Sequence, residues 1–168
     1  MDNDELHMIL KKLVGTYFDR VFARGNKIAL KNNRYYVFNT QIYPKTGHFI
    51  ALYCCGMNVY VFDSLGVNNI SHEDFLCQKT PNIIYLNDKK LQSDYSTVCA
   101  LYCIFFIYHA NRGKSFSFIL SHFTMSQDKN DRLLYVWYLQ NRFFRKYKQI
   151  NILDTNHIEN VISQVCEL

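Results

Sequence analysis

The chain has 168 residues, a formal charge of +5 at neutral pH and a sequence pI near 8.8. Hydrophobic residues make up 49% of it, with 13 tyrosines and 13 phenylalanines, which excludes an intrinsically disordered chain and predicts a single folded domain over residues 1–168. The moderate positive charge permits an anionic partner without requiring one.

The cysteines indicate a reducing compartment. Six of them occur, at positions 54, 55, 77, 99, 103 and 166, and the first residues, MDNDELH, are acidic and polar, unlike a signal peptide. We therefore expect free thiols rather than a disulfide framework. No CxxC pair is present, so no metal site is predicted.

The first predicted element is an amphipathic helix, capped by the acidic residues at 2–4 and ending at Gly15. The stretch after it, TYFDRVFARG, is expected to form a short second helix or an irregular segment. The inward stripe of the first helix would consist of Leu6, Ile9, Leu10 and Leu13.

Three strand candidates follow, at about 35–39, 48–54 and 58–63. The last two are joined by the tight connection at 55–57, so they should pair as an antiparallel hairpin. Such a hairpin places its two outer ends, His48 and Asp63, beside each other. An imidazole would then lie within reach of a carboxylate.

After a turn at SLG, we expect a short helix near 72–77 and a strand at 82–86. A polar run containing Gln92 then leads into an apolar helix that starts at Cys99. Apolar residues lie on every side of this helix, so it should be surrounded by protein, and it is far shorter than the ~20 residues of a membrane span. Its expected caps are Ser96 or Thr97 at the start and Arg112 with Gly113 at the end.

Cys99 is a candidate nucleophile because of its position. A thiol at a helix N-terminus meets the positive end of the helix macrodipole, which favours the thiolate. The alternative is that Cys99 is a small buried hydrophobic residue, as free cysteines commonly are.

The remaining chain is predicted to be helical. It contains a short apolar piece at 116–123, a long amphipathic helix at about 128–148 and a last helix at about 156–166. Helices, a small sheet and helices again predict an α+β fold, with a mainly antiparallel sheet packed against helices. The long helix should turn toward the core its apolar residues Leu133, Val136, Trp137, Phe143, Phe144 and Tyr147.

Together, His48, Asp63, Gln92 and Cys99 suggest thiol acyl transfer. That chemistry needs a thiolate to attack a carbonyl, an imidazole to exchange protons, a carboxylate to orient the imidazole, and donors for the oxyanion. Each residue also has an ordinary interpretation: a strand-end histidine, a turn-starting aspartate and a solvated loop amide. Their joint order and spacing favour the catalytic interpretation.

The order His, Asp, Gln, Cys, with Cys99 seven residues after Gln92, resembles the adenain family of viral cysteine proteases. The matching stretches are TGHFIALY, VYVFDSLG and LQSDYSTVCALYCIFF, and the similarity runs through the whole chain, including RLLYVWYL near the C-terminus. The resemblance implies a papain-like or adenain-like α+β fold whose buried central helix carries the nucleophile.

The resemblance also implies roles. Cys99 would be the nucleophile, His48 the general base and later acid, Asp63 the group that fixes the imidazole, and Gln92 an oxyanion donor with the backbone N–H of Cys99. The implied activity is that of a cysteine endopeptidase that cleaves viral precursor and capsid proteins after glycine-containing motifs during virion maturation. It would act as a monomer, away from membranes, in the virion and the infected-cell nucleus.

The chain departs from the family pattern at several positions. Ala100 stands where the family usually has glycine, Phe49 where tryptophan is common, and Asp63 replaces the glutamate of the adenovirus enzymes. The adenovirus enzyme is activated by a viral peptide through a disulfide and by DNA. Cys77 is the only upstream candidate for such a peptide-cofactor cysteine.

A basic cluster near the C-terminus is a candidate DNA-binding surface. Its residues Arg142, Arg145, Lys146 and Lys148 are interleaved with aromatic residues, so they could bind phosphates in a salt-sensitive, sequence-independent manner. The alternative is a solvated basic end of a helix, which the helix dipole also favours.

Two further functions remain open. One is deconjugation of a ubiquitin-like modifier, because the wider clan of such proteases shares the same order of four residues. The other is a non-catalytic binding protein with this fold, which the complete set of four residues disfavours.

Overall fold

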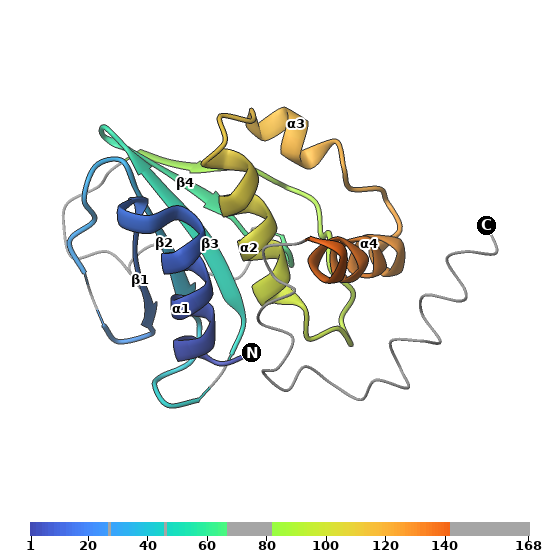
Figure 1. Cartoon of the computed structure of the whole chain (residues 1–168), viewed down its shortest axis with the longest axis horizontal. Helices are drawn as coiled ribbons and strands as arrows, with labels where there is room; N and C mark the ends of the chain where they lie inside the picture. The colour runs from blue at the N-terminus through green and yellow to red at the C-terminus, as the bar shows by residue number, and fades with distance from the viewer. Residues whose placement is uncertain (27, 46, 67–81, 142–168) are drawn as a thin grey trace.

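The computed structural model describes residues 1–26, 28–45, 47–66 and 82–141. It shows a five-stranded sheet with helices packed against it (Figure 1), so the predicted α+β class is confirmed. The helices predicted near 72–77 and at 156–166 lie outside the described residues.

The N-terminal helix α1 spans Asn3–Val14, as predicted. Asp2 is its N-cap and forms a capping box with Glu5, in which each side chain accepts a hydrogen bond from the other residue's backbone N–H. The backbone leaves the helix at Gly15, where φ is +60°. The buried residues of α1 are Leu6, Ile9, Leu10 and Val14, whereas Leu13 is partly buried.

The sheet has the order β1-β2-β3-β4-β5. The predicted hairpin is confirmed, with Cys55 opposite Asn58 and Ala51 opposite Phe62. The central pairs β2·β3 and β3·β4 are antiparallel, but the outer pairs β1·β2 and β4·β5 are parallel, so the expected antiparallel arrangement holds for the three central strands only. The strands are β1 (Phe18–Ala23), β2 (Arg34–Asn39), β3 (Phe49–Cys55), β4 (Asn58–Phe62) and β5 (Asn82–Tyr85).

The prediction of a short second helix or an irregular segment over TYFDRVFARG is wrong. Only Gly15–Tyr17 forms a 3-10 turn, and Phe18–Ala23 is the edge strand β1. Phe18, Phe22 and Ala23 are buried, and pairing with β2 gives the backbone its hydrogen-bond partners. Aromatic and β-branched residues favour such a pleated surface, and this tertiary pairing outweighs the weak local helical pattern.

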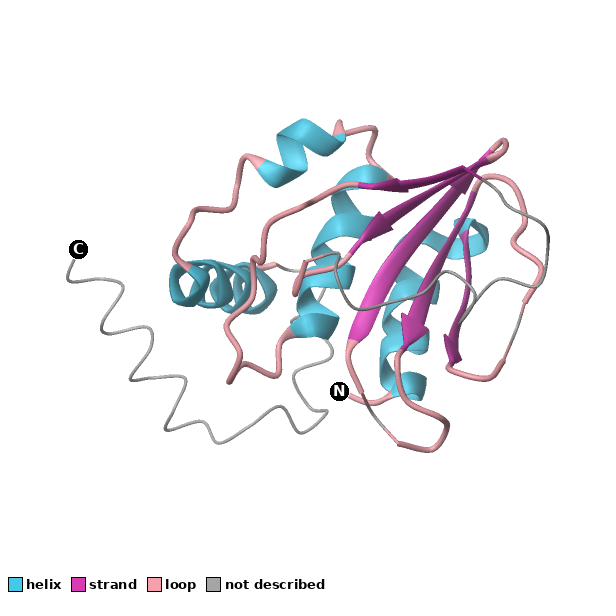
Figure 2. Cartoon of the chain, turned by 180° about the vertical axis from the view of Figure 1, so that it is seen from behind, coloured by secondary structure: helices cyan, strands magenta, loops and turns pink. Residues whose placement is uncertain are grey.

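The central helix α2 spans Cys99–Ala110, and all its residues from Cys99 to Ile107 are buried. It packs on the same face of the sheet as α1 (Figure 1). Seen from behind, the strands lie in front of both helices (Figure 2). This burial confirms a helix surrounded by protein. No helix in the described part of the chain is long and apolar enough to cross a bilayer.

Two helices follow α2 within the described residues. The short α3 (Phe116–Leu120) is capped by Ser115, and α4 covers Gln127–Gln140. The predicted inward face of this helix is partly wrong, since Leu133 is 40% exposed and Leu134 is fully buried instead. Trp137 packs against the core, whereas the predicted core residues Phe143, Phe144 and Tyr147 lie outside the described residues.

Candidate active site

His48 and Asp63 lie together at one end of the hairpin. His48 Nε2 is 2.6 Å from Asp63 Oδ1, and both side chains are mostly buried. The adjacency predicted from hairpin register is therefore confirmed. Because Nε2 faces the carboxylate, the other ring nitrogen is left for a second partner.

A loop built on Asn39 places His48. The buried Asn39 side chain accepts hydrogen bonds from the N–H groups of Gln41 and Gly47, both at 3.0 Å, and donates to the carbonyl of Lys45. Thr40 closes the loop, since its hydroxyl accepts from His48 N and its own N–H donates to His48 O. These hydrogen bonds hold the backbone of His48 and thereby fix where its imidazole lies.

Asn87 fixes Asp63. Its Oδ1 accepts from Asp63 N at 3.2 Å, and its Nδ2 donates to the carbonyl oxygen of Asp63. The Asp63 carboxylate also accepts from Leu65 N at 2.9 Å, as expected for an aspartate that starts a turn. Asp63 therefore both starts the turn and contacts the imidazole of His48.

Cys99 is the first residue of α2 and is 8% exposed. The predicted side-chain cap is wrong, because Val98 is the N-cap and makes no such bond. Ser96 Oγ accepts instead from Val98 N, at 3.4 Å, one residue before the helix begins. The first N–H groups of a helix have no partner within the helix, so those at Cys99 can bind an anion.

The side chains of Asp63 and Cys99 oppose the effect of burial on the charge of His48. Burial by itself would lower the pKa of His48, but hydrogen bonds to the side chains of Asp63 and Cys99 raise this pKa to about 9. The imidazole is therefore protonated at neutral pH. A charged imidazolium beside a sulfur favours the thiolate, the form in which a cysteine attacks.

Gln92 is 2% exposed, so the prediction's alternative of a solvated amide is excluded. Its Oε1 accepts a hydrogen bond from Ser64 Oγ at 2.7 Å, and its Nε2 donates to Ser96 O at 2.8 Å. A carboxamide has two N–H groups, so the bond to Ser96 occupies one donor of Nε2.

Helix α4 holds the segment that carries Gln92. Asn130 Nδ2 donates to Leu91 O at 3.0 Å, and the Asp131 carboxylate accepts from Ser93 N and Ser93 Oγ. The hydroxyl of Tyr102 in α2 lies 2.9 Å from Leu91 O and 2.9 Å from Asp131 Oδ1. Gln92 is thus held in place, because Leu91 and Ser93 on either side of it are both hydrogen-bonded to α4.

These supporting residues were not found from the sequence. Asn39, Ser64, Asn87 and Asn130 are buried polar residues whose partners are distant in the chain. A polar side chain inside an otherwise apolar or turn segment is the only local signal, and it does not name the partner. The DSLG sequence predicts a turn but not a bond to Gln92.

Other predicted residues lie outside the described part of the chain: Cys77, Arg142, Arg145, Lys146 and Lys148. The described cysteines Cys54, Cys55, Cys99 and Cys103 are free. Burial raises the pKa of Cys103 well above its usual value, which keeps that thiol neutral one turn after Cys99. Among the described residues, no three His, Cys, Asp or Glu side chains gather as a metal site would require.

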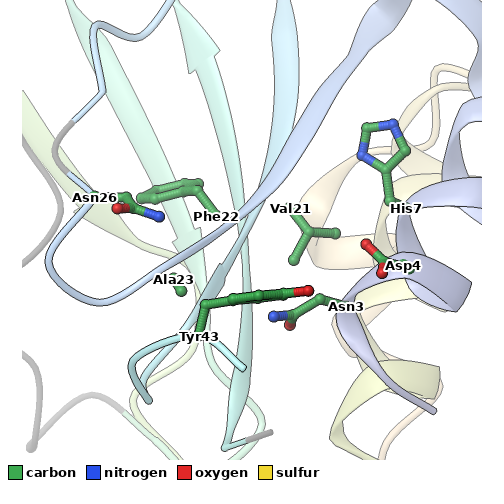
Figure 3. A pocket seen from close by; sticks show the side chains of 8 residues that line it. All are labelled: Asn3, Asp4, His7, Val21, Phe22, Ala23, Asn26 and Tyr43. Carbon is green, nitrogen blue, oxygen red and sulfur yellow. The ribbon is translucent and has the colours of Figure 1, made fainter. Parts of the chain in front are cut away.

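A cavity of about 160 Å³ lies between α1 and β1 (Figure 3). None of His48, Asp63, Gln92 and Cys99 lines it, so it is separate from their cluster. Its lining consists of Asn3, Asp4, His7, Val21, Phe22, Ala23, Asn26 and Tyr43.

Comparison with known proteins gives a partial structural similarity. No protein-family model and no curated protein matches the sequence. A crystal structure of "ASFV pS273R protease" has 19% sequence identity to 58% of this chain, with a TM-score of 0.38. The selenomethionine form of that protease gives 19% identity over 58% of this chain, with a TM-score of 0.37. The matches cover 39% and 41% of those chains, so this chain matches about two fifths of their length.

Proposed function

We propose that this protein is a cysteine endopeptidase with Cys99 as its nucleophile. The observation that carries the proposal is the buried His48, whose Nε2 lies 2.6 Å from the Asp63 carboxylate and whose pKa is raised by the side chains of both Asp63 and Cys99. A histidine with a purely structural role could also have one ring nitrogen hydrogen-bonded to a carboxylate. A buried imidazolium held between a thiol and a carboxylate has the arrangement that thiol proteases need.

The proposed reaction has two halves. The Cys99 thiolate attacks the substrate carbonyl, and the oxyanion that forms is bound by the free N–H of Gln92 Nε2 and by the backbone N–H of Cys99. His48 then gives its proton to the leaving amine as the C–N bond breaks, which leaves an acyl-thioester. The now neutral His48 takes a proton from water, which attacks the thioester, so that the acid is released and the Cys99 thiolate is restored beside a protonated His48.

The finer proposal rests on the resemblance of the motifs around His48, Asp63 and Cys99 to adenain-like proteases. The substrates would be viral precursor proteins, cleaved after glycine during particle maturation in the virion or the infected-cell nucleus. DNA and an activating peptide are proposed cofactors on the same basis.

The test is cleavage of a fluorogenic peptide with an aliphatic residue and Gly-Gly before the scissile bond. Wild type should cleave it, Cys99→Ala should not, and Cys103→Ala, which removes the same group one turn further along α2, should retain activity. Duplex DNA is added in a parallel arm, where a rise in rate would support an adenain-like cofactor. Equal rates for wild type and Cys99→Ala would contradict the proposal.

A second assay separates the substrate classes. Wild type is offered viral capsid precursors and conjugates of a ubiquitin-like modifier. Preferential release of the modifier would replace the maturation role by deconjugation, with the same chemistry at Cys99.

A further inference from the structure

We infer that Ser64 is a positioning residue for the oxyanion donor: its hydroxyl fixes the orientation in which the Gln92 carboxamide presents an N–H to the substrate. The inference rests on the proposed function, since it assigns a role within the same site. Ser64 follows Asp63 directly, so adjacent residues at the end of β4 would orient the imidazole and the oxyanion donor.

Ser64 holds Gln92 through both backbone and side chain. The carbonyl oxygen of Ser64 accepts from Leu91 N at 2.8 Å and from Gln92 N at 2.9 Å. Its hydroxyl donates to Gln92 Oε1 at 2.7 Å. Ser64 is 1% exposed and Gln92 2%, so water does not readily replace these bonds.

The Ser96 carbonyl, which can only accept, and the Ser64 hydroxyl, which donates to Oε1, together fix which way the carboxamide faces. With Oε1 on Ser64, Nε2 meets the carbonyl of Ser96 at 2.8 Å and keeps a second N–H available. In the flipped orientation, Oε1 would face the Ser96 carbonyl, two acceptors would oppose each other, and the donor would turn away. The Ser64 hydroxyl therefore stabilises the orientation that catalysis needs.

The backbone of this turn is itself held. Asn87 binds both the N–H and the carbonyl of Asp63, and the Asp63 carboxylate binds His48 and Leu65 N. A hydroxyl placed on such a fixed backbone can orient a neighbour with little freedom of its own. Preorganised donors of this kind stabilise the transition state more than the bound substrate.

The test is a double-mutant cycle on peptide cleavage with Ser64→Ala and Gln92→Ala. Ser64→Ala should lower kcat about 10-fold and leave KM within about 2-fold, because the lost contact acts through a transition-state donor. Gln92→Ala should cost about 10²–10³ in kcat. The double variant should be no slower than Gln92→Ala alone, since Ser64 has nothing left to orient.

Two controls separate positioning from a structural role. Alkylation of Cys99 by iodoacetamide forms no oxyanion, so its rate in Ser64→Ala should equal that of wild type. Ser121→Ala removes a hydroxyl that donates to Phe118 O in α3, and its kcat should equal the wild-type value. If Ser64→Ala is unfolded by circular dichroism, Ser64→Cys, similar in size and a weaker donor, replaces it in the cycle.

The outcomes distinguish the two levels of the proposal. An active wild type in which the Ser64 and Gln92 losses multiply, or in which Ser64→Ala slows Cys99 alkylation, overturns the positioning role and leaves the protease function standing. A wild type that neither cleaves peptides nor is trapped at Cys99 by peptide aldehydes overturns both. If the losses in kcat of Ser64→Ala and Gln92→Ala do not multiply and the rate of Cys99 alkylation is unchanged, both the positioning role and the protease function are supported.

Discussion

The protonation of His48 depends on two opposing effects. Burial of the imidazole favours its neutral form, but the Asp63 carboxylate and the Cys99 side chain stabilise the charged form more strongly, so its pKa rises to about 9. A histidine pKa raised above its usual 6.5 contributes stability that is fully present below pH 6.5 and is lost as pH rises through 9. Activity should depend on the protonation of the same residue, because in the proposed reaction His48 donates a proton to the leaving amine.

We therefore predict an alkaline limb near pH 9 in the pH profile of kcat/KM. Asp63→Asn removes the charge that raises the pKa while keeping a hydrogen-bonding oxygen, so the limb should move at least about one pH unit lower. The measurement is kcat/KM from pH 5 to 10 for both proteins. An alkaline limb at the same pH in both would show that the carboxylate does not control His48.

Gly47 has no room for a side chain. A Cβ at this position would lie 2.4 Å from Cγ of Gln41 and 2.9 Å from Oγ1 of Thr40, the atom that accepts the N–H of His48. We predict that Gly47→Ala displaces His48 and lowers kcat/KM about tenfold or more, since small misplacements of reacting groups are costly. Lys45→Ala, in the same loop, should keep wild-type kcat/KM. A Gly47→Ala enzyme with wild-type kcat/KM would contradict this account.

At the level of elements, α4 holds the segment before the nucleophile. Asn130 and Asp131 bind the residues on either side of Gln92, and Tyr102 connects the same point to α2. Three separate elements, the turn after β4, α2 and α4, therefore meet at one short segment. The position of Gln92, the proposed oxyanion donor, then depends on the packing of α2 and α4 around this segment.

We predict that Asp131→Ala both destabilises the protein and slows catalysis. It leaves the buried Tyr102 hydroxyl and the Ser93 groups with one partner fewer, which should cost about 1–3 kcal/mol. At about 2–4 °C per kcal/mol, Tm should fall by several degrees, and kcat by several-fold. Asp128→Ala, an exposed change in the first turn of the same helix, is the control. Equal Tm and equal kcat in Asp131→Ala and Asp128→Ala would contradict the role of Asp131 in holding the segment around Gln92.

The packing of α2, α3 and α4 includes a histidine held neutral. Burial, followed by the positive charges of His122, Arg112 and Lys114, lowers the pKa of His109 to about 4. The unfolded chain binds a proton there below pH 6.5 while the folded chain does not until about pH 4. This residue therefore lowers stability as pH falls from 6.5 toward 4.

His109→Phe tests this effect, because it keeps an aromatic ring against Phe105 and Trp137. We predict that the fall in Tm between pH 7 and pH 4.5 is smaller in the variant than in wild type. Thermal unfolding at the two pH values measures it. The same fall in both proteins would mean that His109 is not the residue responsible.

For the whole molecule, the sequence predicted most of the described elements and the juxtaposition at the candidate site. Hairpin register alone placed His48 beside Asp63, and a polar-to-apolar transition placed Cys99 at a helix start. Both inferences depend on local periodicity, which the chain carries within a few residues. They succeed because the three central strands and α2 follow their local patterns.

What the sequence did not predict depends on distant partners. Phe18–Ala23 becomes a strand only because β2 lies beside it, and the parallel pairing of β5 with β4 joins residues that are distant in the chain, such as Val61 and Tyr85. Leu134 rather than Leu133 is buried against the core, which the pattern of neighbouring apolar residues in α4 does not decide. Likewise, nothing local to Ser64 or Asn130 names Gln92 or Leu91 as a partner.

Covalent trapping shows whether His48 makes Cys99 a nucleophile, as proposed for this protein. Wild type and His48→Ala are treated with a peptide vinyl sulfone ending in Gly-Gly, and the modified residues are located by mass spectrometry. Cys99 should be modified rapidly in wild type and little in His48→Ala, and the buried neutral thiol of Cys103 should not be modified in either protein. Equal labelling of Cys99 with and without His48, or no labelling of Cys99 at all, would contradict this role of His48.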